Sequence, residues 1–526
     1  MSFTAKLKNS ADKALHYLFV HKKVLIVFLF LLTILIRVPN LLRDYTSDDS
    51  TVMYMDVAGN IKDGNGWRVD HRFIYTNNTF EDDSIAHQMH ETAPLYPLFL
   101  AGVFIFNDSF TAAVFANILL AGLLIVLIYL FADKLFGQKI ALVSAAVVML
   151  NPTMYALSVY VWSEILFCIL LLLAFYFAIF PKNNYYFALS GMFAGMAYLT
   201  RYPGVVIVVG ILIWLLFIRK NYKPAFIFGV FSFLAALPWF IRNYLLFNNP
   251  LFYTSTSIGM STIGRAQSYP GQPSVFQYPF TEFLRYSRVT FLDNLSALGS
   301  VESLFILLPF VILGCALYMR NRNIQPLIIF SFLTFIVMSA GMSLSGWHCR
   351  YLIPIFIVLT PLGVAMMFKS IKYLMSTKSD ALPILRDYRK IITLLLAFIF
   401  LVNCVQITGQ AYYNITTNIS EEKEAYKWLS DHTSSSDKTA STYPCDDHYF
   451  TGLESTLMPD VNETVMEGFI ERFSITYFVI ILNPGFDAYS TNITRELYLG
   501  NENVTVGSKN LSLVYRNDAV LIYQVC

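Results

Sequence analysis

Long apolar stretches recur along most of this 526-residue chain, and they constrain its fold more than any other feature. A helix of about 20 apolar residues crosses the ~30 Å hydrocarbon core of a bilayer. With 56% of its residues hydrophobic and only 14% charged, the chain is too apolar for an ordinary soluble protein. We therefore predict a polytopic α-helical membrane protein with about 11 transmembrane helices, near residues 20–38, 110–132, 139–158, 162–180, 186–200, 203–218, 225–244, 301–319, 326–343, 351–368 and 391–409. Pro203 either separates two of these spans or kinks one.

The distribution of lysine and arginine predicts the orientation of these spans. Basic residues gather before the first span and around 182, 219–223, 320–322 and 369–390. The positive-inside rule makes these segments and the N-terminus cytoplasmic. The first loop (about 39–109), the loop at about 245–300 and the tail from about 410 are then extracytoplasmic. All nine N-x-Ser/Thr sequons fall in those outer segments, at Asn77, Asn107, Asn294, Asn414, Asn418, Asn462, Asn492, Asn503 and Asn510.

The chain divides into a membrane domain, residues 1–409, and an extracytoplasmic domain, residues 410–526. In the second, EEKEAYKWL is typical of a helix, whereas ITYFVIIL, NLSLVY and AVLIYQV are typical of strands. We predict a small α/β domain there. Its Cys445 and Cys526 could form a disulfide on an oxidising side of the membrane, and the sequence leaves this open.

Two short helices are predicted within the first loop. Tyr54, Val57, Ala58 and Ile61 recur at helical spacing and form one apolar face. Asp49 or Ser50 can cap the start of this helix, and Gly64 and Gly66 can end it. The segment PLYPLFLAGVFIF predicts the second helix. Both are expected to lie in the plane of the interface, outside the membrane.

Charged residues on the outer face suggest chemistry. Asp48 and Asp49 precede the first loop helix, where a carboxylate can act as a general base or simply as an N-cap. Four arginines lie at the outer ends of predicted spans: Arg37, Arg201, Arg242 and Arg350. Such arginines can reach interfacial water, but four on the outer side exceed what the positive-inside rule favours. Because guanidinium groups suit phosphate oxygens, we predict a phosphate site facing outward.

Six segments, in order, carry a resemblance to a known family: DDSTVMYMDVAGNIKDGNGW, APLYPLFLAG, NPTMYALSVYVWSEILF, GMFAGMAYLTRYPGVV, LPWFIRNYLLFNNPLF and RYLIPIFIVLTPLGVA. They span roughly residues 37–368. The chain resembles integral-membrane glycosyltransferases of the GT-C class. It is most similar to the protein O-mannosyltransferases and aminoarabinose transferases that use polyprenyl-phosphate sugars, glycosyltransferase family 39-like proteins.

The resemblance implies roles for particular residues. Asp48 or Asp49 matches the catalytic base, and Glu164 matches a second acidic position that orients donor or acceptor. Arg201, Arg242 and Arg350, with Tyr96 and Tyr351, match positions near the donor phosphate. Tyr54, His90 and Glu91 are candidate acceptor- or substrate-orienting residues. Relatives commonly have KPPLYP where this chain has HETAPLYP, so the basic residue of that part of the phosphate site is missing here.

No cofactor or metal is expected. The histidines of HQMHE do not follow the order of a zinc protease motif. A divalent cation at Asp48 and Asp49 stays an alternative, although the family usually handles monophosphate donors without one. A net charge of +2 gives no reason to expect a nucleic-acid partner.

The predicted function is inverting transfer of a sugar from a polyprenyl-phosphate donor, of the dolichyl phosphate mannose type, to a hydroxyl on protein, lipid or glycan. The predicted partners are that donor, the acceptor and membrane lipids. The main alternative is a transporter or flippase of a lipid-linked substrate, which sparse mid-span charges argue against. An oligosaccharyltransferase catalytic subunit should carry a WWDYG-like motif, and none occurs. A purely structural membrane protein would leave the acidic loop and the arginines unexplained.

Overall fold

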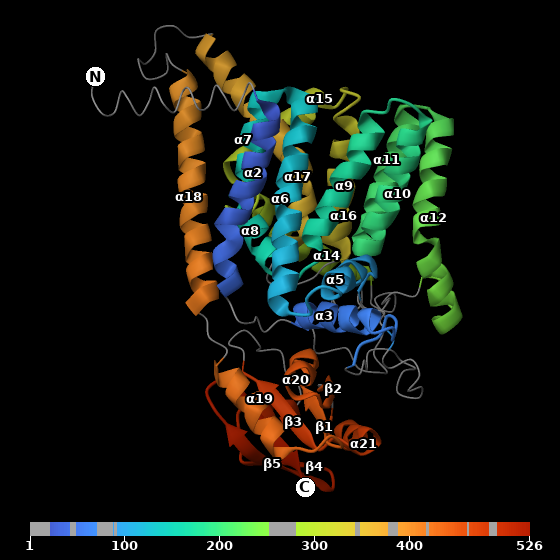
Figure 1. Cartoon of the computed structure of the whole chain (residues 1–526), viewed down its shortest axis with the longest axis vertical. Coiled ribbons are helices and arrows are strands. Elements are labelled where there is room, and N and C mark those ends of the chain that lie inside the picture. Colours follow the sequence, from blue (N-terminus) through green and yellow to red (C-terminus); the bar gives the residue numbers. More distant parts are fainter. Residues whose placement is uncertain are drawn as a thin grey trace, which may run out of the picture.

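A bundle of long helices makes up most of the molecule, and a small α/β domain lies against one of its ends (Figure 1). The computed structural model describes residues 21–42, 49–70, 88, 92–251, 280–341, 348–376, 388–416, 420–459, 462–482 and 492–526. The predicted fold class, a polytopic helical membrane protein with a small C-terminal α/β domain, is confirmed.

Each of the eleven apolar stretches forms helix. The bundle consists of α2 (Lys22–Arg37), α6 (Phe110–Phe136), α7 (Gln138–Met149), α8 (Pro152–Val159), α9 (Glu164–Ile179), α10 (Asn184–Thr200), α11 (Val205–Ile213), α12 (Tyr222–Phe247), α15 (Leu308–Tyr318), α16 (Gln325–Gly341), α17 (His348–Ser376) and α18 (Tyr388–Thr416). Short irregular turns extend several of them: η1 (Val38–Leu42), η2 (Tyr202–Gly204), the π-helical η3 (Trp214–Ile218) and η6 (Phe305–Leu307).

Not every described helix of the bundle is long enough to cross a membrane on its own. Within the described ranges, four helices are long and apolar enough to cross a membrane: Lys22–Leu42, Phe110–Phe136, Tyr222–Phe247 and Cys349–Tyr373. Helices α7 and α8 pass the same test only as a pair bent by 61°. The bend follows from Pro152 at the start of α8, because proline cannot continue the preceding helix. An integral membrane protein is thus supported, and the count of 11 spans stays a prediction.

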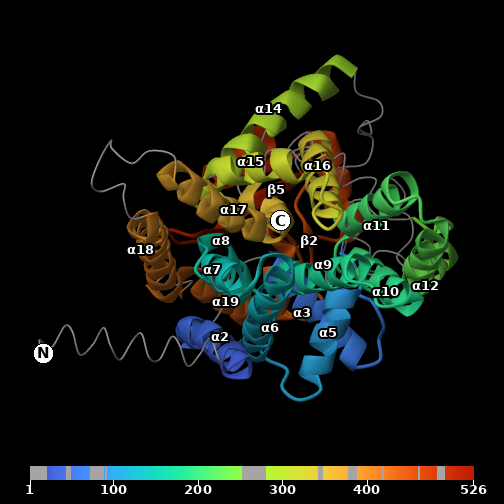
Figure 2. The ribbon, with the colours of Figure 1, turned by 90° about the horizontal axis from the view of Figure 1, so that it is seen from above.

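Burial separates the central helices from those at the rim. In α17, 83% of the most apolar window is buried inside the protein, compared with 28% in the window of α2. Figure 2 shows α17 within the bundle and α2, α12 and α18 around it. The rim helices therefore present apolar side chains outward, where lipid would cover them.

The chain makes a tight turn after α10, so Pro203 separates two helices. Arg201 has an extended backbone, and η2 then leads into α11. A Cβ on Gly204 would lie 2.6 Å from the backbone nitrogen of Tyr198 and 2.7 Å from the carbonyl carbon of Ala197. Only glycine permits this close approach, which places Arg201 at the turn between α10 and α11.

Both predicted loop helices form, as α3 (Asp49–Lys62) and α5 (Leu95–Phe104). Gly64 and Gly66 follow α3 with φ of +84° and +82°, a conformation that favours glycine. Figure 1 shows α3 lying across the end of the bundle, between the bundle and the C-terminal domain. A further helix, α14 (Phe280–Gly299), packs against α16 and α17 and extends outward in Figure 2.

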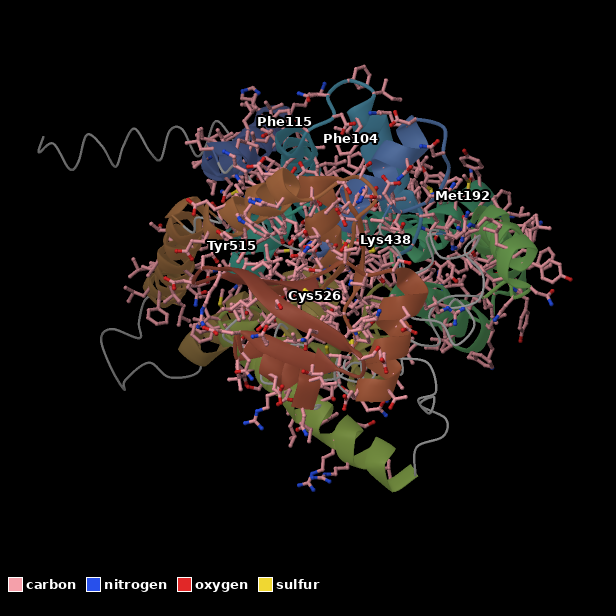
Figure 3. All side chains as sticks on the ribbon, turned by 90° about the horizontal axis from the view of Figure 1, so that it is seen from below. Phe104, Phe115, Met192, Lys438, Tyr515 and Cys526 are labelled. Atoms are coloured by element: carbon pink, nitrogen blue, oxygen red, sulfur yellow. The ribbon has the colours of Figure 1, made fainter. Side chains whose placement is uncertain are left out.

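The C-terminal domain is a six-stranded mixed sheet with helices on both faces. Its elements are α19 (Ser420–His432), β1 (Lys438–Ser441), α20 (Pro444–Thr451), β2 (Glu454–Leu457), α21 (Glu463–Phe473), β3 (Tyr477–Ile481), α22 (Asn492–Tyr498), β4 (Asn503–Val506), β5 (Lys509–Arg516) and β6 (Val520–Val525). The strand order is β2-β1-β3-β6-β5-β4, with β1 parallel to β2 and β3 and the other pairs antiparallel. Figure 3 shows this sheet over the end of the bundle.

Side chains along β3 alternate between the two faces of the sheet, and each face packs against its own layer of helices. Tyr477, Val479 and Ile481 pack toward α19 and α20, whereas Phe478 and Ile480 pack toward α21 and α22. The possible Cys445–Cys526 disulfide is not formed, since both residues are free thiols. The reason is position: Cys445 is buried on α20 at the bundle side, and Cys526 is exposed at the far end of the domain (Figures 1 and 3).

Candidate active site

Glu164 is the centre of a buried charged cluster at the end of the bundle that carries α3 (Figure 1). It is the first residue of α9, where a carboxylate interacts favourably with the positive end of the helix dipole. Its side chain is only 2% exposed. The oxygen Oε1 forms ion pairs with two arginines, with Arg201 Nη1 at 2.5 Å and with Arg350 Nε. Two guanidinium groups and one carboxylate leave one positive charge in excess.

A hydroxyl chain connects this cluster to the first loop. Arg201 Nη1 also donates to Ser163 Oγ at 3.3 Å, and that oxygen lies 3.1 Å from the hydroxyl of Tyr54 on α3. Tyr54 is buried, and this burial raises the pKa of its hydroxyl, so the group is neutral at physiological pH. The loop helix α3 is therefore attached to the residues that hold Glu164.

Aromatic rings line the cluster. The guanidinium of Arg350 lies 3.8 Å from the ring centroid of Trp162, and the guanidinium groups of Arg350 and Arg201 each lie 5.8 Å from the ring centroid of Tyr351. Stacking on aromatic faces holds a guanidinium in place without removing its hydrogen-bond donors. A small cavity of about 20 Å³ opens beside the cluster, enough for one water molecule. It is lined by Glu164, Phe167, Arg201, Pro203, Phe330, Thr334, Met338, Arg350, Tyr351, Ile353 and Pro354.

Tyr96, predicted near the donor phosphate, lies one layer behind the cluster. Its ring packs edge-on against Tyr54 at 4.9 Å, and its hydroxyl donates to Asn117 Oδ1 at 3.1 Å. Asn117 in turn donates to the carbonyls of Tyr160 and Trp162. Because Tyr96 is fully buried and its hydroxyl is already bonded, its described contacts support Tyr54 and do not reach the charged cluster.

Arg242 lies beside the first loop and has no described contact with Glu164. Its guanidinium lies 4.5 Å from the ring of Trp239, and it donates to Gln88 Oε1 at 3.3 Å. Trp239 Nε1 donates to the hydroxyl of Tyr202, the residue after Arg201. No carboxylate pairs with Arg242 within the described ranges, so its charge forms a second, neighbouring positive point.

Arg37 has a different environment from Arg201, Arg242 and Arg350. It is 1% exposed and bonds to Ser158 Oγ, to the carbonyl of Thr33 and to that of Met149. These bonds tie α2 to the α7–α8 bend. Its sequence setting resembled that of the other three, but its contacts indicate a structural role.

Several predicted residues cannot be placed. Asp48, His90 and Glu91 lie outside the described residues. Asp49 begins α3, although its side chain is not described. Among the described residues no group of three or more histidine, cysteine, aspartate or glutamate side chains could hold a metal ion.

The structure adds site residues that sequence reasoning missed. Ser163 and Trp162 stand directly before Glu164 in the VWSE segment, and proximity to a predicted site residue could have indicated them. Asn117, Tyr202 and Trp239 come from other helices. Nothing in their local sequence distinguishes them from ordinary helix residues.

Comparisons with known proteins agree with this fold. Residues 91–241 match the family described as dolichyl-phosphate-mannose-protein mannosyltransferase. The structure is similar to ArnT from Cupriavidus metallidurans bound to undecaprenyl phosphate, with a TM-score of 0.58 and 13% identity over 96% of this chain and 98% of that one. Both point to one architecture. The chain has the GT-C glycosyltransferase fold.

A second kind of GT-C enzyme shares this fold. The Archaeoglobus fulgidus oligosaccharyltransferase, in complex with Zn and sulfate, gives a TM-score of 0.58 and 12% identity over 86% of this chain and 68% of that one. Its structure tethered to an acceptor peptide with the NVT sequon gives 0.57 and 13% over 88% and 69%. No curated protein matches the chain. The predicted resemblance to GT-C glycosyltransferases is confirmed, and the family match over residues 91–241 supports transferase activity.

Proposed function

We propose that this GT-C protein transfers a sugar from a polyprenyl-phosphate donor to a hydroxyl acceptor at the extracytoplasmic face of the membrane, with inversion at the anomeric carbon. The observation that carries the proposal is the buried Glu164 held by Arg201 and Arg350. A protein that only needed to neutralise a buried carboxylate would require one arginine. The second one provides a positive charge for a ligand.

The excess charge suits a phosphate leaving group. A polyprenyl-phosphate sugar is a phosphodiester with one negative charge, and its phosphate gains a second negative charge as the sugar leaves. Buried, oriented guanidinium groups stabilise such developing charge more strongly than water does. In this proposal Arg350 and Arg201 bind the phosphate, Tyr351 keeps both arginines in place, and Arg242 contributes from the neighbouring positive point.

Glu164 also has a free acceptor. Both ion pairs use Oε1, and the other carboxylate oxygen, Oε2, is buried with no hydrogen-bond partner in the described part of the chain. A buried carboxylate oxygen without a donor is costly, so a donor is expected when substrate binds. We assign that donor to a hydroxyl of the sugar or of the acceptor.

The base is assigned to the first loop. Asp49 begins α3, and α3 reaches the cluster through Tyr54 and Ser163. In the proposed step, the acceptor hydroxyl attacks the anomeric carbon on the side opposite the phosphate. The carboxylate of Asp49 or Asp48 accepts the hydroxyl proton, and the bond between sugar and phosphate breaks.

The relatives support a lipid-linked donor. One ArnT structure contains undecaprenyl phosphate, and one oligosaccharyltransferase structure contains a tethered acceptor peptide. Likeness at 12–13% identity carries over the fold alone, so the sugar and the acceptor are not assigned.

The test is to incubate the purified protein with a panel of polyprenyl-phosphate sugars and candidate acceptors, and to measure hydrolysis and transfer by mass spectrometry. We expect turnover by the wild type and its loss in Asp49→Asn or in Asp48→Asn, since asparagine retains capping but cannot accept the proton. Wild-type turnover by both variants would exclude these bases. Absence of donor binding across the panel would instead favour the transporter alternative.

A further inference from the structure

The C-terminal domain touches the first-loop helix that bears the proposed base. Helix α20 contacts α3, and the apolar cluster formed by α3, α5 and α6 includes Cys445 of α20, with Phe450 packed against it. Figure 1 shows α20 directly below α3. Cys445 is 6% exposed, so the domain covers this face of the loop closely.

A polar contact lies beside this apolar one. His448 of α20 has its Nε2 atom 3.7 Å from Oδ2 of Asp70, at ion-pair range. The other ring nitrogen, Nδ1, lies 2.8 Å from the carbonyl of Leu453. A carbonyl only accepts, so Nδ1 carries a proton. When Nε2 is protonated too, the ring is a cation that faces the Asp70 carboxylate.

Asp70 also forms hydrogen bonds with residues of α3. Its backbone nitrogen donates to Asp56 Oδ2 at 2.8 Å. The side-chain amide of Asn60 donates to Asp70 Oδ1 at 3.2 Å and to Asp56 Oδ1 at 3.1 Å. Asp56 and Asn60 are both residues of α3, so the imidazole is connected to the helix that begins with Asp49 by two short steps.

We propose that His448 and Asp70 are positioning residues for the transfer reaction, which hold the C-terminal domain on α3 and thereby fix the helix that bears the base. This inference rests on the proposed function. It concerns a part of the chain, residues 444–451, that lies outside the segment matching the mannosyltransferase family.

The contact has a pH dependence with a defined sign. Burial lowers the pKa of His448, but Asp70, the Leu453 carbonyl and the nearby Asp56 raise it, and the net pKa lies above the ordinary 6.5. The interaction with His448 holds the pKa of Asp70 below its ordinary 3.8. A raised histidine pKa stabilises the contact fully below about pH 6.5, and this stabilisation is lost as pH rises through the folded-state pKa.

The size of the effect is limited by solvent. The side chain of Asp70 is 51% exposed and that of His448 is 24% exposed. Partly exposed ion pairs are weak, so we expect loss of the His448 charge to lower kcat about two- to fivefold without abolishing activity. The KM for the donor should stay unchanged, because neither residue contacts Arg201 or Arg350.

The test compares the wild type with His448→Gln and Asp70→Asn from pH 6 to pH 9. The matched control is His432→Gln, because His432 Nδ1 also lies against a backbone carbonyl, that of Trp428, but has no carboxylate partner in the described ranges. We expect wild-type kcat to fall at alkaline pH, both variants to start lower and show a flatter profile, and the control to follow the wild type. A wild-type profile in His448→Gln would overturn the proposal.

A second measurement separates this inference from the proposed function. In a Cys404→Ser/Cys526→Ser background, reaction of Cys445 with a maleimide at pH 7 reports whether α20 stays docked. We expect faster labelling in His448→Gln than in the parent, even if no donor on the panel is turned over. Equal labelling rates in the two proteins would overturn the positioning role.

Discussion

At the scale of single residues, the arrangement of Glu164, Arg201 and Arg350 explains more of the proposed chemistry than any motif. Removing either arginine leaves a balanced pair, whereas removing the glutamate leaves two buried cations facing each other. Loss of one partner from a buried ion pair typically costs about 3–5 kcal/mol. We therefore expect variants that lack one arginine to fold and lose function, and variants that lack the glutamate to lose stability.

Arg350→Gln should fold and lose donor affinity. Arg201 still neutralises Glu164, but the positive charge for the phosphate is gone. We expect donor binding to weaken about 100-fold, near 3 kcal/mol. The control is Arg219→Gln, since Arg219 also lies over a tryptophan, Trp214 at 5.1 Å. Donor titration of both proteins measures the difference, and equal affinity in the two would contradict a phosphate role.

Glu164→Gln should instead reduce stability. Glutamine keeps one hydrogen bond to an arginine but cannot offset either charge. We expect a clear decrease in the thermal midpoint, measured by loss of monodisperse protein in detergent, and partial recovery in the Glu164→Gln/Arg201→Gln double variant. A midpoint equal to the wild type would show that Glu164 is not needed to balance the arginines.

At the scale of elements, the turn between α10 and α11 places Arg201, and its geometry depends on Gly204. Replacing Gly204 with alanine puts a Cβ against the backbone of Ala197 and Tyr198, which cannot move aside. We expect a loss of about 1–3 kcal/mol in stability and lower donor affinity. Gly409→Ala is the control, because nothing lies within 4 Å of its added Cβ. Wild-type stability and wild-type donor affinity in Gly204→Ala would argue against this packing.

The elements themselves were largely predictable. Apolar length identified each bundle helix, and the spacing of Tyr54, Val57 and Ala58 identified α3. In the C-terminal domain, three strands and α19 follow from apolar runs and helix formers. The short strands β1, β2 and β4 did not, because four residues of mixed polarity carry little periodic signal. The sequence predicts one span near 139–158, but the chain bends there into α7 and α8 because Pro152 begins a new helix.

The candidate site was predictable only in part. Glu164, Arg201 and Arg350 were singled out from their positions at helix ends and from the family resemblance. Arg37, Arg201, Arg242 and Arg350 look alike in sequence, yet only Arg201 and Arg350 meet Glu164, because their surroundings depend on how distant helices pack. The contact between the hydroxyl groups of Ser163 and Tyr54 likewise depends on tertiary packing, so local sequence does not predict it.

At the scale of the whole molecule, the predicted topology and the packing of each sequon predict which asparagines carry glycans. Asn294 is buried at 2% exposure in α14, and its side chain donates to Ser339 of α16 at 3.3 Å. Asn503 lies on the edge strand β4 of the C-terminal domain and Asn510 on the neighbouring strand β5, and both residues are exposed. In a host that glycosylates N-x-Ser/Thr sites, we expect glycans on Asn503 or Asn510 and none on Asn294.

Glycopeptide mass spectrometry checks this expectation, with Thr505→Ala and Ser512→Ala as controls that remove the sequons of Asn503 and Asn510. A glycan on Asn294 would contradict the packing of α14 against α16. Complete absence of glycans from the C-terminal domain, in a host that modifies a control protein, would argue against its extracytoplasmic position.

The central claim is tested most directly by following one donor molecule through the reaction. Purified protein is mixed with a polyprenyl-phosphate sugar that binds, together with its acceptor, and both products are quantified over a single turnover. The account predicts equal amounts of free polyprenyl phosphate and glycosylated acceptor from the wild type, and neither product from a folded Arg201→Gln/Arg350→Gln variant. Equal product from the two proteins would contradict the assignment of the Glu164 cluster as the transfer site.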